Sequence, residues 1–217
     1  MSCRVASVVV LAAALAFSSA SHAALKAGQD YETLQAAQPT QVPAGKTEII
    51  EFFSFACPHC YEAHRKVLEW GHKLPSNVTF RQIPVVFDHP GWQPLAQAAW
   101  AMQATGDFDR LETPFFDAIH KEQKPLLDEK AITAWMVQHG VDATKFTTAW
   151  NSFSVNTHMA QNDRMIESYQ ITGVPMFVVD GRYTAGGTTF DQVLANAATL
   201  AGQAKAAPAA AAAPKKS

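Results

Sequence analysis

The sequence predicts an α/β protein with an inserted helical domain, and three observations predict this class. A run of aromatic and β-branched residues at 47–55 leads directly into a helical pattern. Strand patterns are absent between Asp88 and Ile171, where helix signals repeat. Apolar runs then return on both sides of Asp180-Gly181 near the C-terminal end.

The first unit is a predicted strand, helix and strand. Residues 47–55, "TEIIEFFSF", suit a buried strand. The helix that follows ends before Pro75, and helical spacing brings four of its side chains together: Cys60, Val67, Leu68 and Leu74. Residues 77–87, "NVTFRQIPVVF", form the second strand. Such a β-α-β unit predicts parallel pairing with the helix on one face.

The helical block has signals of its own. In "DEKAITAWMVQHG", Asp128 is placed to cap a helix and Gly140 lies beyond its end, and the apolar side consists of Ile132, Trp135, Met136 and His139. Four of the five tryptophans fall in this block, which indicates a separate core: Trp92, Trp100, Trp135 and Trp150. After it, Asp180-Gly181 predicts a two-residue hairpin, and a last helix is expected over 190–204.

The two ends of the chain predict export and a tail. One Arg, an apolar run from Val8 to Phe17 and small residues up to Ala23 form the pattern of a secretory signal peptide cleaved after Ala23. Cys3 would leave with it. The Ala/Pro-rich end, 204–217, lacks the large apolar side chains needed to order it, so we expect a disordered tail.

The composition limits the kinds of molecule that the protein is expected to bind. The whole sequence is 48% apolar, enough for a sizeable core, and its formal net charge of −2 offers no basic field for nucleic acid or anionic lipid. We therefore expect proteins or small molecules as partners, and no nucleic acid.

Cys57 and Cys60 enclose a Pro and a His, and several kinds of site use such a pair. A structural zinc site needs four ligands, and only histidines could complete it here: His59, His64 or His72. A structural disulfide would close a very small loop and stabilise little. Covalent c-type haem is excluded because Tyr61, and not His, follows the second cysteine. Besides the zinc site and the structural disulfide, the remaining alternative is a redox dithiol.

The redox interpretation explains more of the residues. If Cys57 ends the strand, Pro58 occupies the first helical position, where its missing N–H costs nothing. The N–H groups of His59 and Cys60 and the helix dipole would then favour a thiolate at Cys57, making it the exposed nucleophile. A nearby His59 imidazolium would add to this effect. Cys60, one turn into the helix, would resolve the mixed disulfide.

"EFFSFACPHCY" after a signal peptide, together with "GVPMFVVDG" beyond a helical block, resembles the DsbA family of periplasmic thiol:disulfide oxidoreductases over residues 45–203. DsbA is itself a standard example of a low cysteine pKa and an oxidising potential. The resemblance implies a thioredoxin fold with an inserted helical domain. The expected boundaries are a signal peptide (1–23), a first thioredoxin-like part (24–87), the helical domain (88–171), a second thioredoxin-like part (172–203) and the tail (204–217).

The same resemblance implies residue roles. Cys57 would be the nucleophile, Cys60 the resolving thiol, and Val174-Pro175, with a cis Pro175, the loop that faces the disulfide. A cis Pro presents the preceding backbone to an extended chain, so Val174, Pro175 and Pro58 are expected to contact substrate.

Glu51 shares a strand face with Phe53 and Phe55, and a buried carboxylate there could relay protons to the thiols. A surface position at a strand end is the alternative. The resemblance places a Lys on the next strand as partner of such a carboxylate, but Gln82 stands there, with Arg81 adjacent.

The expected activity is that of a periplasmic, monomeric oxidase without a cofactor. It would donate the Cys57–Cys60 disulfide to reduced, unfolded exported proteins and be reoxidised by a membrane quinone reductase of the DsbB type. A reductase or isomerase is the rival within this class. A non-catalytic module that binds peptide or metal is the rival outside it. Equilibration with glutathione separates them.

Overall fold

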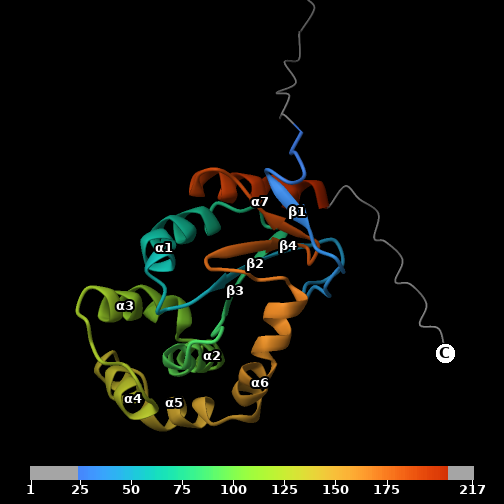
Figure 1. Ribbon diagram of the computed structural model, residues 1–217. Helices are drawn as coiled ribbons and strands as arrows, with labels where there is room; N and C mark the ends of the chain where they lie inside the picture. Colours follow the sequence, from blue (N-terminus) through green and yellow to red (C-terminus); the bar gives the residue numbers. More distant parts are fainter. Residues whose placement is uncertain (1–23, 205–217) are drawn as a thin grey trace, which may run out of the picture.

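The computed structural model describes residues 24–204, which form a five-stranded sheet with helices on both faces (Figure 1). The predicted signal peptide with its cleavage after Ala23, and residues 205–217 of the predicted tail, lie outside the described residues. The strands, in the sheet order β1-β5-β4-β2-β3, are β1 (Tyr31–Thr33), β5 (Tyr183–Ala185), β4 (Met176–Val179), β2 (Thr47–Phe53) and β3 (Val78–Pro84).

β2 is the interior strand that leads to the two cysteines. It pairs in parallel with β3 and antiparallel with β4. Every residue of β2 is buried, because the sheet is covered on both sides, and this explains why its sequence is nearly continuously apolar. The register places Glu51 opposite Gln82 of β3.

The two faces of the sheet have different covers. Ile49 of β2 packs with residues of α1 (Pro58–Gly71) and α7 (Phe190–Ala204). Ile50 and Phe52, which point the other way, pack with residues of α2 (Gln93–Thr105) and α6 (Phe153–Ser168). Figure 1 shows α1 and α7 together on one side of the sheet and α2 and α6 on the other.

The helices between β3 and β4 surround the end of β2. A short 3-10 turn (Pro90–Trp92) precedes α2, and the block continues with α3 (Phe108–His120), α4 (Glu129–Gln138) and α5 (Ala143–Trp150) before α6. Phe53 and Phe55 lie in one apolar cluster with residues of these helices and with both cysteines. The core of the block is therefore continuous with the site at the start of α1.

The predicted class, a thioredoxin fold with an inserted helical domain, is confirmed by this architecture and by the relatives described below. The Asp128 cap is confirmed, since its Oδ1 accepts from the N–H of Ala131 at 2.8 Å. The hairpin is confirmed, and Asp180 and Gly181 have φ values of 52° and 61°, but its loop is one residue longer than predicted, because Val179 pairs with Tyr183 and leaves Arg182 in the loop as well.

Three details differ from the prediction. β2 ends at Phe53 and β3 at Pro84, so both strands are shorter than expected. Beyond Pro84 the chain leaves the sheet, and the N–H of Val86 is satisfied by Oδ1 of Asn162 at 3.1 Å instead of by a neighbouring strand. β1 was not predicted, and Trp100 packs with the sheet rather than with the core of the helical block.

Within residues 24–204, none of the helices has the length and apolarity needed to span a membrane.

Candidate active site

Cys57 and Cys60 lie where β2 passes into α1. Cys57 is the cap residue of the helix in an extended conformation, and Pro58 is the first helical residue, as predicted. The carbonyl of Cys57 accepts the N–H of Tyr61 at 3.1 Å, which begins the helical hydrogen bonding. The two thiols are free, so the structure shows the reduced form of the pair.

The surroundings of Cys57 favour its thiolate, and its pKa is lowered to about 6. The largest cause is a hydrogen bond from the Cys60 thiol. Burial opposes it, and the backbone N–H groups of Cys60 and His59 lower the pKa further. The N–H groups were predicted from the sequence, whereas the thiol of Cys60 as the leading donor was not. Only 7% of Cys57 is exposed, so the expectation of an exposed nucleophile is wrong.

Cys60 has the opposite environment. It is 1% exposed, and burial raises its pKa far above the ordinary range. Its hydrogen bond to Cys57 and the charge of Glu51 add to this effect. The pair is therefore strongly unequal: Cys57 carries the thiolate and Cys60 keeps its proton.

His59 contributes little to this difference. Its ring is largely exposed, and Nδ1 lies 3.3 Å from Oε2 of Glu62. Its charge is the smallest of the causes that lower the pKa of Cys57. The charge of His59 therefore lowers the pKa of Cys57, as predicted, but by less than the backbone N–H groups do.

Val174 and Pro175 lie against the dithiol, although they are far from it in the sequence. The Val174 carbonyl oxygen is 3.5 Å from Cys57 Sγ, and the bond between Val174 and Pro175 is cis, as the resemblance implied. This loop reaches the dithiol because it precedes β4, the neighbour of β2. A surface pocket beside it is lined by His59, Glu62, Ala63, Lys66, Pro175 and Phe190.

Glu51 is buried, with 3% of its surface exposed, so the alternative of a surface position is wrong. Its pKa is raised to about 8, first by burial and then by the charge of Glu112. Nε2 of Gln82 donates to Oε2 of Glu51 at 2.9 Å, and this hydrogen bond lowers the pKa again. An amide thus occupies the place that the resemblance assigned to a lysine.

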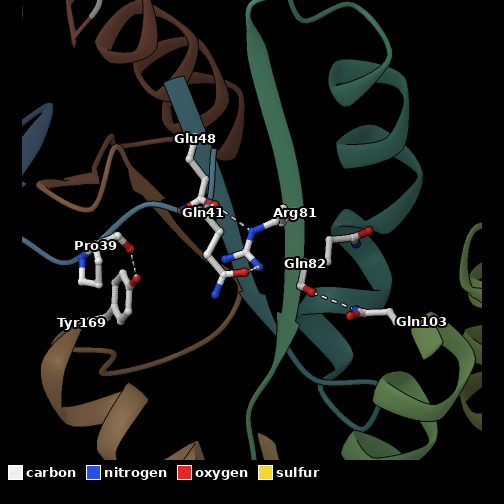
Figure 2. Close-up of polar contacts among 7 residues, drawn as sticks. All are labelled: Pro39, Gln41, Glu48, Arg81, Gln82, Gln103 and Tyr169. Atoms are coloured by element: carbon white, nitrogen blue, oxygen red, sulfur yellow. Dashed lines mark hydrogen bonds and ion pairs between the residues drawn. The ribbon is translucent and has the colours of Figure 1, made fainter. Parts of the chain in front are cut away.

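Arg81 does not replace that lysine. Its Nε donates to Oε1 of Glu48 at 2.8 Å, and its Nη1 donates to Oε1 of Gln41 at 3.0 Å. Figure 2 shows Arg81 extending from β3 toward Glu48, while Gln82 extends to the other side of the strand. Because neighbouring residues of a strand point to opposite faces, Arg81 cannot reach the face of Glu51.

Sequence reasoning missed two further buried groups on the Glu51 side. Glu112 of α3 accepts a short hydrogen bond from Nε2 of Gln82. His64 of α1 places Nδ1 at 3.4 Å from Oε1 of Glu112 and Nε2 at 2.7 Å from Oγ1 of Thr113. His64 was considered only as a possible zinc ligand, and Glu112 stands out only as a charged residue at a core position of an amphipathic helix.

No group of three or more His, Cys, Asp or Glu side chains in the described part of the chain is arranged to hold a metal ion. A dithiol at a helix N-terminus, a cis-proline loop against it and a sheet with a helical block inserted between β3 and β4 define a thioredoxin-fold protein built for thiol–disulfide chemistry.

Comparisons with known proteins support the same class, a thioredoxin-fold protein for thiol–disulfide chemistry. Residues 48–198 match the family model described as a DSBA-like thioredoxin domain. A thiol:disulfide interchange protein DsbA from Burkholderia cepacia is 40% identical over 176 residues, covering 81% of this chain and 82% of the relative. A protein of that name from Bordetella parapertussis is 37% identical over 180 residues, covering 83% and 84%.

Solved structures give the same result. The crystal structure of Pseudomonas aeruginosa DsbA matches with a TM-score of 0.76 and 32% identity, covering 84% of this chain and 95% of that one. DsbA from Xylella fastidiosa matches with a TM-score of 0.78 and 28% identity, covering 84% and 99%. The chain belongs to the DSBA-like thioredoxin domain family, and it is a thiol:disulfide oxidoreductase.

Proposed function

We propose that this protein is a periplasmic oxidase that donates the Cys57–Cys60 disulfide to reduced exported proteins and is reoxidised by a membrane quinone reductase of the DsbB type. The observation that carries the proposal is the inequality of the two thiols: the pKa of Cys57 is lowered to about 6, while that of Cys60 is raised. A stabilised thiolate favours the reduced form of the protein, and a protein that prefers to be reduced gives its disulfide away.

The reaction follows from this inequality. A client thiolate attacks the Cys57 sulfur of the oxidised protein, the Cys57–Cys60 bond breaks, and its electron pair goes to the Cys60 sulfur. A second client thiolate then attacks the client sulfur of the mixed disulfide and releases Cys57 as a thiolate. The client is oxidised by two electrons and the protein is reduced by two. Cys57 suits the role of leaving group because a thiol of low pKa leaves faster.

Cys60 needs a proton when it leaves, because burial disfavours its thiolate. We assign this step to Glu51, which lies close enough to affect the pKa of Cys60 and whose own pKa of about 8 keeps it protonated at neutral pH. A carboxyl group with a pKa near the working pH suits proton transfer.

Clients are proposed to bind next to the Val174-Pro175 bond. The Val174 carbonyl oxygen already lies 3.5 Å from Cys57 Sγ, so an extended client chain that pairs with this backbone would bring its own sulfur to Cys57. Pro175 and Pro58 would contact the client from either side of Cys57. The pocket lined in part by Pro175 and Phe190 offers space for a neighbouring client side chain.

Two measurements test the proposal. Equilibrated with glutathione buffers, the protein should stay largely reduced at ratios where structural disulfides remain closed. An oxidation state that follows those structural disulfides would favour a reductase. A protein that never forms mixed disulfides, yet binds reduced peptides, would favour a binding module. Fractionation of cells tests the location: the mature protein should appear in the periplasmic fraction and begin at Ala24.

A further inference from the structure

Two fully buried carboxylates share one amide group beside the active site. Glu51 is 3% exposed and Glu112 is 1% exposed. Nε2 of Gln82 donates to Oε2 of Glu51 at 2.9 Å and to Oε1 of Glu112. One amide nitrogen carries two protons, so it can serve both carboxylates at once.

The charges of this cluster decide where its proton lies. Two carboxylates this close cannot both be ionised away from water without a cation. Among the described residues, neither of them forms an ion pair with a lysine or arginine. Gln82 is neutral, and Arg81 is held by Glu48 on the other face of the sheet (Figure 2).

His64 breaks the symmetry between the two carboxylates. Its Nδ1 lies 3.4 Å from Oε1 of Glu112, and no corresponding contact reaches Glu51 in the described structure. Glu51 is the carboxyl whose pKa is raised, first by burial and then by the neighbouring charge of Glu112, so the shared proton is placed on Glu51.

Two surface pockets border this buried cluster. One pocket is lined in part by Gln82 and Glu112, and another in part by His64 and Thr113. The titratable groups that face the cluster come from three elements: Glu51 on β2, Cys60 and His64 on α1 with His72 at its end, and Glu112 with Asp109 on α3.

We propose that Glu112 is a positioning residue for the thiol–disulfide reaction: through Gln82 and its own charge it holds the proton on Glu51 that Cys60 receives when the disulfide opens. This inference rests on the proposed function. In that step the Cys57–Cys60 bond breaks, the Cys60 sulfur takes the electron pair and the Glu51 proton, and Glu51 becomes a carboxylate. The two adjacent charges then draw a proton back from solvent.

Glu112→Gln tests the inference, because it removes the charge and keeps the shape of the side chain. Carbon-13 NMR of the Glu51 carboxyl in the reduced protein should show its pKa falling from about 8 by one or more. With a fall of one, the protonated fraction of Glu51 at pH 8 drops from about a half to about a tenth, and the rate of disulfide opening by a client thiol drops about fivefold.

Matched variants separate charge from structure. Glu112→Asp keeps the charge and should retain most of the wild-type Glu51 pKa and pH–rate profile. Glu69→Gln makes the same charge change at an exposed position of α1 and should change neither. Gln82→Lys places a cation between the carboxylates and should lower the Glu51 pKa even though Glu112 is present.

Two results would overturn the inference while leaving the proposed function intact. One is an unchanged Glu51 pKa in Glu112→Gln. The other is a lowered pKa with a ratio of variant to wild-type rates that stays constant between pH 6 and pH 9. If instead the wild-type protein does not oxidise clients at all, the proposed function fails, and the NMR titration still decides whether Glu112 holds the proton on Glu51.

Discussion

Replacing Cys60 with Ala removes the hydrogen bond that contributes most to the low pKa of Cys57. A hydrogen bond to a charged group contributes about 1.5–3 kcal/mol, and about 1.36 kcal/mol corresponds to one pKa unit. We therefore expect the pKa of Cys57 to rise from about 6 to about 7–8. The N–H groups of His59 and residue 60 remain in the variant, so the pKa should stay below that of a free cysteine.

The ultraviolet absorbance of the thiolate, followed against pH in the reduced protein, measures this pKa. Cys60→Ser provides the matched control, because its hydroxyl can still donate to the Cys57 sulfur, and it should shift the pKa less than Cys60→Ala. His59→Ser removes the smallest of the contributions and should also shift the pKa less. A Cys60→Ala protein that titrates near the wild-type value, or a larger shift in His59→Ser, would refute the reasoning.

Two further predictions concern the mechanism and the fold. Cys60→Ala should accumulate covalent complexes with client proteins on non-reducing gels, because no second thiol can open them, and Cys57→Ala should accumulate none; equal capture by both variants would reverse the two roles. Arg81→Ala should lower the free energy of unfolding by about 3–5 kcal/mol, since it leaves Glu48, which is 0% exposed, without its cation. Lys66→Ala removes an exposed ion pair and should cost about 1 kcal/mol or less in urea unfolding; similar losses in both variants would contradict the role of Arg81.

The parts of the fold that sequence predicts well are those with local causes. The strand into Cys57, Pro58 at the first helical position and the turn at Asp180-Gly181 each depend on a few adjacent residues. Asp128 caps its helix for the same reason. The Val174-Pro175 loop was placed against the cysteines through the resemblance, because the sequence itself contains no signal for a cis bond.

The parts that were missed depend on contacts between distant elements. β1 has three residues and no periodic pattern, and it is a strand only because β5 pairs with it. Nothing in the sequence relates His64 to Glu112, because their contact forms only where α1 packs against α3. The leading effect of Cys60 on the pKa of Cys57 likewise depends on the orientation of one side chain.

The central claim is that a stable Cys57 thiolate makes this protein a disulfide donor, and its reduction potential as a function of pH tests it most directly. With a pKa of about 6, Cys57 is about nine-tenths ionised at pH 7, which stabilises the reduced form by about 1.4 kcal/mol, or about 30 mV toward oxidising, relative to an ordinary cysteine. This stabilisation is present above the lowered pKa and is lost as the pH falls through it.

The potential, measured by equilibration with glutathione, should therefore change its slope near pH 6. Below that pH reduction takes up two protons, and the slope should be about −59 mV per pH unit. Above it Cys57 stays ionised and only Cys60 takes up a proton, so the slope should be about −30 mV per pH unit. A slope that stays near −59 mV per pH unit up to about pH 8 would mean that Cys57 is protonated like a free cysteine, and it would contradict the account.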